Sequence, residues 1–110
     1  MNNPCGARSI RLESRERYQR LINKDLGSSG IKSGHVILRP GENIGGHTTG
    51  EREEVIIILK GNGEASIDKG NILKIDENVI LYIQPETSHD IKNTGSAILE
   101  YIFVTSSAKI

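Results

Sequence analysis

A chain of 110 residues with 14 basic and 14 acidic residues has room for one domain and carries no net charge. This balance argues against a phosphate-binding surface, and an aromatic content of 4% argues against a stacking platform for single-stranded nucleic acid. No apolar run is long enough to span a membrane and no signal peptide is recognisable. We therefore expect a cytoplasmic protein that binds neither nucleic acid nor membranes.

The first 33 residues are expected to form an N-terminal arm. Residues 9–13 alternate apolar and polar side chains, which predicts a short strand or an extended arm, and residues 15–26 space their apolar side chains as a short helix would. A Gly-Ser-Ser-Gly loop follows at residues 27–30. The single cysteine, Cys5, has no partner for an intramolecular disulfide and is interpreted as an incidental thiol.

Residues 34–110 predict an all-β domain. Short runs rich in β-branched residues are separated by Gly, Pro, Asn and Asp about every ten positions, which is typical of an antiparallel sandwich or barrel. The runs are residues 35–39, 54–60, 63–67, 72–75, 79–83, 89–92 and 97–104.

The run at residues 55–59 is apolar at every position. Alternate residues of a strand face opposite sides, so both faces of this strand must be covered. We expect a cavity or a second sheet on the inside, and another layer or a second subunit on the outside. If Glu54 faces inward, Ile56 and Ile58 face inward with it, and the interior beyond the carboxylate is aliphatic.

Candidate chemistry is carried by His47, Glu54 and His89. Imidazole and carboxylate groups together suit divalent transition metals. A carboxylate at the start of an apolar strand is costly unless it is paired, hydrogen-bonded or bound to a metal. The sequence leaves two interpretations open: a metal site with three protein ligands, or a buried, hydrogen-bonded polar cluster without metal.

Residues 41–61 (GENIGGHTTGEREEVIIILKG) resemble the first motif of the cupin family. Four of its positions fall in register, namely Gly41, His47, Glu54 and Gly61. Thr49 stands where the motif has its second metal-binding histidine.

Residues 78–93 (NVILYIQPETSHDIKN) resemble the second cupin motif less closely. His89 and Asn93 match it. The Gly, Pro and Gly of that motif are replaced by Asn78, Gln84 and Glu86.

The resemblance implies an antiparallel double-sheet jelly-roll barrel with a metal on His47, Glu54 and His89. The metal would be Fe, Mn, Zn or Ni, weakly bound because Thr49 lacks an imidazole, although its hydroxyl could hydrogen-bond a metal-bound water. Small cupins pair as homodimers, often by exchanging N-terminal strands, and residues 9–13 are the candidate strand.

Several further residues are candidates for the cavity wall. Arg39 shares a strand face with His35, and would clamp an anionic substrate if that face pointed inward; otherwise it lies on the surface. Tyr82 and Tyr101 are candidates for the cavity mouth, with core or edge packing as the alternative. His35 has no motif partner and is interpreted as structural.

Two functions from different classes fit these observations. The first is an enzyme with dioxygenase- or isomerase-like chemistry on a small polar molecule, in which the metal acts as a Lewis acid or activates oxygen. The alternative is a non-catalytic domain that binds a small ligand in a degenerate, metal-free site. The sequence identifies neither the ligand nor the metal, since one fold hosts many activities.

Overall fold

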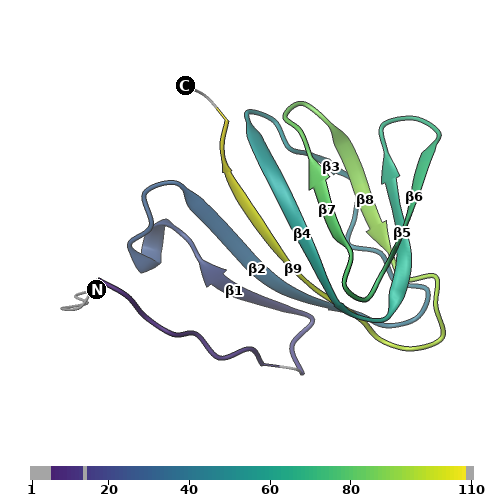
Figure 1. The fold of residues 1–110 in the computed structure, drawn as a ribbon, viewed down its shortest axis with the longest axis horizontal. Coiled ribbons are helices and arrows are strands. Elements are labelled where there is room, and N and C mark those ends of the chain that lie inside the picture. Colours follow the sequence, from purple (N-terminus) through teal and green to yellow (C-terminus); the bar gives the residue numbers. More distant parts are fainter. Residues whose placement is uncertain (1–5, 14, 109–110) are drawn as a thin grey trace.

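Two antiparallel sheets face each other in the computed structural model, which describes residues 6–13 and 15–108 (Figure 1). The five-stranded sheet has the order β1-β2-β9-β4-β7, and the four-stranded sheet has the order β3-β8-β5-β6. The strands are β1 (Tyr18–Ile22), β2 (Ile31–Leu38), β3 (His47–Thr48), β4 (Arg52–Lys60), β5 (Asn62–Ile67), β6 (Asn71–Asp76), β7 (Ile80–Ile83), β8 (Ser88–Lys92) and β9 (Leu99–Ser107). The predicted all-β double-sheet barrel is confirmed. No helix in the described residues is long and apolar enough to cross a membrane.

The helix predicted for residues 15–26 is wrong. The chain there forms β1, which pairs with β2, and then a single 3-10 turn at Lys24–Leu26. Pairing with β2 gives this segment backbone partners and buries Leu21, and this tertiary contact overrides a short helical spacing of apolar residues. Since β1 is an edge of the large sheet, part of the expected arm belongs to the barrel.

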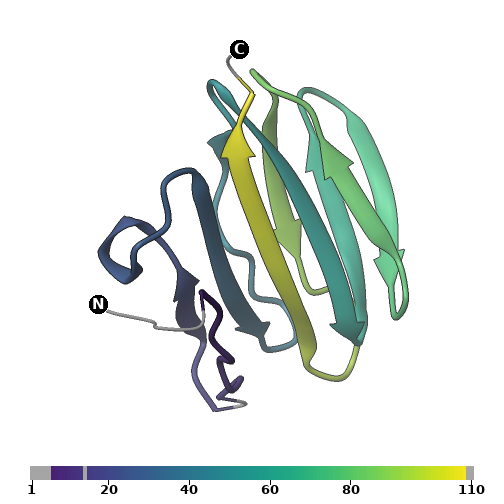
Figure 2. The same ribbon diagram turned by 60° about the vertical axis from the view of Figure 1, so that its left-hand side comes forward.

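Of the two alternatives predicted for residues 9–13, the short strand is not formed and the segment is an arm without regular secondary structure. These residues run alongside β1 without regular pairing (Figure 2). The Gln19 side chain attaches them: its Nε2 donates to Arg11 O at 2.9 Å, and its Oε1 accepts from Glu13 N at 2.6 Å. The amide thereby replaces the backbone ladder that a strand would have formed. Cys5 lies outside the described residues.

The side chains of strand β4 face inward and outward as predicted. Glu54, Ile56 and Ile58 are buried and face the space between the sheets, whereas Val55 and Ile57 are half-buried on the outer face. The core between the sheets consists of Val36, Leu38, Ile56, Ile58, Ala65, Ile75, Leu81, Ile83, Ile91, Leu99 and Tyr101. The inner face of β4 therefore joins the carboxylate of Glu54 directly to an aliphatic core.

Two positions where the second cupin motif has glycine keep the backbone conformation that glycine favours. Asn78 has φ 71° and Glu86 has φ 57°, both in the left-handed region. Asn tolerates this region well, while Glu adopts it at a cost of about 1 kcal/mol. Gly61 also has a positive φ, and a Cβ there would collide with the carbonyl oxygen of Ile98. The turns that carry the motif are thus preserved despite the changed residues.

Candidate metal centre

The three predicted ligands meet between the sheets. His47 on β3 and His89 on β8 are a cross-strand pair of the four-stranded sheet, with ring centroids 4.2 Å apart. Glu54 reaches them from β4 in the five-stranded sheet, and its Oε1 lies 3.1 Å from His89 Nε2. One ligand atom from each residue lies within 4.8 Å of the other two. With metal–ligand bonds of about 2.1 Å, small side-chain shifts place all three around one ion.

Backbone carbonyls fix the tautomer of both histidines. His47 Nδ1 is 2.9 Å from Gly45 O, and His89 Nδ1 is 3.1 Å from Thr87 O. A carbonyl oxygen only accepts, so Nδ1 is the donor in each ring. The Nε2 lone pairs of both rings are therefore left for a ligand, which is the arrangement of metal-binding histidines.

The surroundings of His89 Nε2 are the best indication that these residues suit a metal ion. It is buried and has no aligned hydrogen-bond partner in the described part of the chain, although Glu54 Oε1 is close enough for charge attraction. Glu54 itself is only 6% exposed. Buried polar atoms without a partner are costly, and a cation between these two groups satisfies both.

Burial and charge act in opposite directions on His89. Burial lowers its pKa, but the contact with Glu54, the hydrogen bond to Thr87 and the charges of Glu54 and Asp90 together raise it above its ordinary value of 6.5. Without a metal, the carboxylate therefore favours the imidazolium form of His89. Burial, with the charges of Glu54 and Asp90, raises the pKa of Tyr101, so its phenol stays protonated beside the site.

A cavity of about 290 Å³ opens beside the three ligands. Its walls are largely aliphatic and aromatic, with Val36, Ile44, Ile56, Ile91, Tyr101 and Phe103 among them. Thr49 lines it too. The volume suits a small molecule, and the walls favour one with an apolar part.

Thr49 does not offer its hydroxyl to the metal position as predicted. Its Oγ1 donates to Gln84 O at 2.8 Å and accepts from Thr87 N at 3.0 Å. The backbone adds a bond from Thr49 N to Thr87 O and one from Glu86 N to Gly50 O. Thr49 thus fastens the turn before β4 to the turn before β8, and its hydroxyl is used there rather than on a metal-bound water.

The other predicted wall residues are split between the cavity, the core and the surface. Ile56 and Tyr101 line the cavity, while Ile58 is buried in the core away from it. Arg39 is exposed beyond the end of β2 and does not reach the site, because Val36 and Leu38 are the residues of β2 in the inner core.

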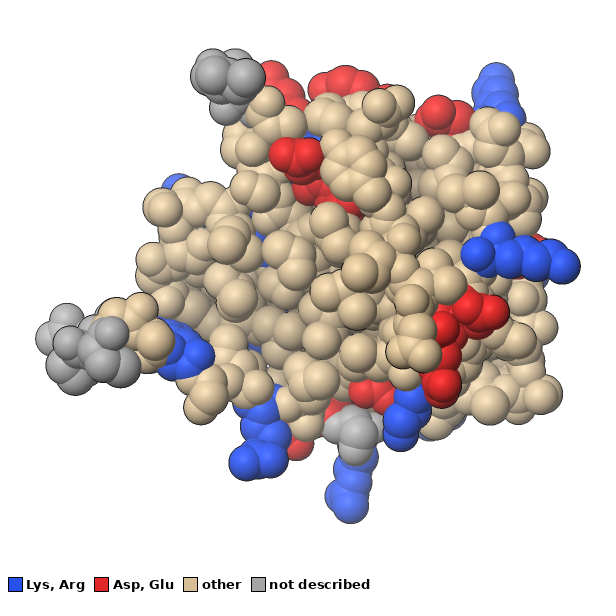
Figure 3. Space-filling model, in the orientation of Figure 1, with Lys and Arg blue, Asp and Glu red and all other residues tan. Residues whose placement is uncertain are grey.

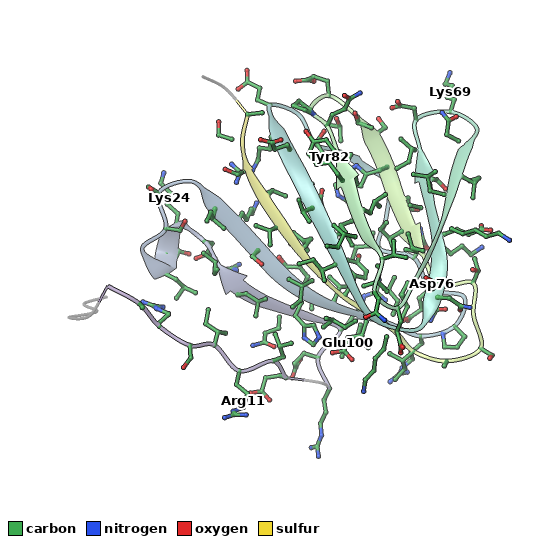
Figure 4. All side chains as sticks on the ribbon, in the orientation of Figure 1. Arg11, Lys24, Lys69, Asp76, Tyr82 and Glu100 are labelled. Carbon is green, nitrogen blue, oxygen red and sulfur yellow. The ribbon has the colours of Figure 1, made fainter. Side chains whose placement is uncertain are left out.

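Tyr82 is 56% exposed on the outer face (Figure 4). Its hydroxyl donates to Glu53 Oε1 at 2.8 Å, so Tyr82 is not a wall of the cavity.

His35 lies on the opposite side of the sheet from the three ligands. It is fully buried, and its Nε2 is 2.7 Å from Oε2 of Glu100. It alternates with Val36, whose side chain enters the inner core. The interpretation of His35 as a structural residue agrees with this position.

Sequence reasoning missed the polar residues at the opposite wall, chiefly Lys32, Arg52 and Thr105. The signal for Arg52 was present: it precedes Glu54 by two positions, so it shares the inner face of β4. Lys32 and Thr105 could be placed only through the cross-strand register, which a single sequence does not contain.

Residues 34–105 match a family model described as a cupin domain. The chain belongs to this cupin family. Over 98 residues it is 31% identical to a Vibrio cholerae protein named "Putative mannose-1-phosphate guanylyltransferase". That alignment covers 87% of the cupin chain but only 21% of the relative, so the chain spans about a fifth of the relative's length.

Solved structures show the same fold. An RmlC-like cupin with a double-stranded β-helix fold from Methanocaldococcus jannaschii superposes with a TM-score of 0.80 at 20% identity, over 93% of this cupin and 92% of that chain. A Thermotoga maritima protein described as a "predicted oxalate decarboxylase" gives a TM-score of 0.74 at 25% identity, over 82% of this cupin and 78% of that chain.

Proposed function

We propose that this cupin binds a divalent transition metal, Fe, Mn, Zn or Ni, through His47, Glu54 and His89, and uses it on a small molecule in the adjacent cavity. The observation that carries the proposal is the buried Nε2 of His89, which faces the Glu54 carboxylate without an aligned hydrogen bond. Both Nδ1 atoms are held by carbonyls, which presets the rings for coordination.

The three ligands leave coordination positions open for a substrate. A bound metal supplies Lewis acidity, or oxygen activation where its redox chemistry permits. The chain contributes an apolar wall at Ile56 and a phenol at Tyr101 that stays protonated and can donate a hydrogen bond into the cavity. The name of the Thermotoga maritima relative refers to oxalate, which agrees with chemistry on a small molecule. Nucleotidyl transfer, named for the Vibrio cholerae protein, has less support because the chain matches a fifth of it.

The competing function is ligand binding without metal or catalysis. It rests on the contact between His89 and Glu54, because an imidazolium–carboxylate pair is a stable arrangement in its own right. It differs from the proposed function in one measurable property, the affinity for a divalent metal.

The test compares Glu54→Gln with Glu53→Gln, its matched neighbour on the outer face of β4. We expect purified wild type to contain a transition metal or to take up one equivalent. Glu54→Gln should weaken metal affinity by at least about a hundredfold because it removes a ligand, whereas Glu53→Gln should leave it unchanged. Elemental analysis and competition with a chelator measure both. Wild type that takes up no metal would support the ligand-binding alternative.

We also propose that this cupin is a homodimer formed through the outer face of its five-stranded sheet. Half-buried Val55 and Ile57 lie on that face with the more exposed Ile80 and Tyr82. Few charged side chains lie over its middle in Figure 3. A second copy of the chain would cover this face in the way that the two-sided apolar character of β4 requires.

A further inference from the structure

Two cations line the cavity beside the predicted metal ligands. Lys32 and Arg52 stand with Thr105 at the side of the cavity that opens toward the connection between β1 and β2. In the part of the chain that the structure describes, neither cation forms an ion pair with a carboxylate. Positive charge of this kind beside a largely apolar cavity favours an anionic ligand.

The Arg52 guanidinium is fixed in place by hydrogen bonds to protein oxygens. Its Nε donates to Thr105 Oγ1 at 2.9 Å, and its Nη2 donates to Thr105 O at 3.1 Å and to Gly30 O at 2.8 Å. The N–H groups of Nη1 have no acceptor among the described residues. A guanidinium held by protein oxygens loses little freedom when it binds an anion, so Nη1 is a pre-organised binding point.

The strand register places both cations close enough to the predicted metal ligands for one small molecule to contact both. Arg52 and Glu54 share the inner face of β4. Lys32 pairs with Thr105, which pairs with Glu54, so these residues form one row across β2, β9 and β4. Strands lie about 4.8 Å apart, so the Lys32 and Glu54 backbones are separated by about 10 Å. A small molecule can therefore contact the cations and approach the metal ligands at the same time.

The cavity wall next to this row restricts the rest of the ligand. Ile56 and Phe103 are paired in the adjacent row and Val36 lies one row further along, and none of the three offers a side-chain hydrogen-bond partner. A polyhydroxylated ligand such as a sugar would lose water there without replacement. An aliphatic or aromatic body would instead bury apolar surface.

We propose that the cavity binds a small carboxylic acid with an apolar body, whose carboxylate accepts from Arg52 Nη1 with Lys32 beside it. The body packs against Val36, Ile56 and Phe103, and the end away from the carboxylate faces His47, Glu54 and His89. This substrate class rests on the proposed function, since it assigns the free end of the acid to the metal.

The test uses benzoate as the probe and benzamide as its uncharged match, titrated by calorimetry or NMR into Zn²⁺-loaded and chelator-stripped protein. Benzoate should bind at least about tenfold more tightly than benzamide, a difference of about 1.4 kcal/mol. Arg52→Gln should abolish that difference, and Lys32→Gln, at an exposed position, should reduce it without disturbing the fold. Arg39→Gln, which changes an exposed arginine outside the cavity, should leave it intact.

The outcomes separate this inference from the proposed metal function. Equal binding of benzoate and benzamide, or a preference that persists in both Arg52→Gln and Lys32→Gln, would overturn the carboxylate assignment. Benzoate binding that requires Zn²⁺ and ignores both substitutions would place the carboxylate on the metal instead. A preference that depends on Arg52 in protein without metal affinity would sustain the anion site and refute the metal site. Much tighter binding of phenyl phosphate would replace the carboxylate with a phosphate ester.

Discussion

At the scale of single residues, the chemistry concentrates on one atom of His89. Its Nε2 can carry a proton, which the Glu54 carboxylate favours, or coordinate a metal, which both residues then share. The two states exclude each other because the same lone pair is used in both. Proton and metal therefore compete directly for this site.

This competition predicts a pH dependence. The raised pKa of His89 means that its proton begins to oppose metal binding above pH 6.5, the ordinary value. Below the raised pKa, affinity should fall by up to about tenfold per pH unit for this single proton. Chelator competition between pH 8 and pH 5.5 measures the effect, with folded His35→Asn as a control whose profile should match wild type. An affinity that stays constant over this range would show that His89 is not a ligand.

The stability of the metal-free protein should change in the opposite direction. A group whose pKa is raised on folding stabilises the folded state when it is protonated. The contribution of His89 is therefore fully present below pH 6.5 and is lost as pH rises through its raised pKa. Protonation of His89 at low pH therefore stabilises the metal-free folded protein and weakens metal binding.

At the scale of elements, Thr49 holds two turns together. Its hydroxyl bonds Gln84 O and Thr87 N, and Thr87 in turn accepts from the ring of His89. The orientation of one predicted ligand therefore depends on a threonine that stands where the first cupin motif has a histidine.

Thr49→Val tests this role, since it keeps the shape of the side chain and removes both hydrogen bonds. We expect the free energy of unfolding to fall by about 1–3 kcal/mol, because the amide of Thr87 is left buried without a partner. Thr49→Ser retains the hydroxyl and should lose clearly less. Urea denaturation measures both. Similar stability of Thr49→Val and wild type would mean that the turns are held by their backbone bonds alone.

The sequence predicts elements well where one strand carries an unambiguous pattern. The inward orientation of Glu54 follows from the alternation of side chains along β4, and the proximity of His47 to His89, though not their cross-strand pairing, follows from the resemblance to the two motifs. Which side chains of β2 face inward could not be predicted, because its buried residues are consecutive and show no alternation. For this reason the sequence alone leaves open whether Arg39 faces the cavity.

Edges and faces away from the motifs were predicted less well. The sequence predicts a helix where β1 forms, because a few apolar residues at suitable spacing fit either structure until the partner strand is known. The sequence predicts Tyr82 at the cavity mouth or in core or edge packing, but in the structure it alternates with the buried residues Leu81 and Ile83 and points outward. In both cases the missing information was the arrangement of the neighbouring strands.

At the scale of the whole molecule, the proposed dimer predicts that one sheet face is protected and the other is not. Ile80 on β7 is 67% exposed on the five-stranded sheet, and Ile72 on β6 is 52% exposed on the four-stranded sheet. Wild type should be a dimer at micromolar concentration by light scattering. Ile80→Asp should shift it to monomer, because a carboxylate would be buried in the interface, while Ile72→Asp should remain a dimer. A monomeric wild type, or dissociation by Ile72→Asp alone, would refute this interface.

The division of the three ligands between the sheets has a consequence for the protein interior. Both imidazoles belong to one sheet and the carboxylate belongs to the other, so the distance between them is set by the side chains that keep the sheets apart. Ile58 and Ile91 are such spacers, although Ile58 does not line the cavity. Bond lengths at a metal are tolerant to only a few tenths of an ångström. The thickness of the aliphatic core is therefore a determinant of the coordination geometry, and selection on metal binding would extend to residues that never contact a ligand.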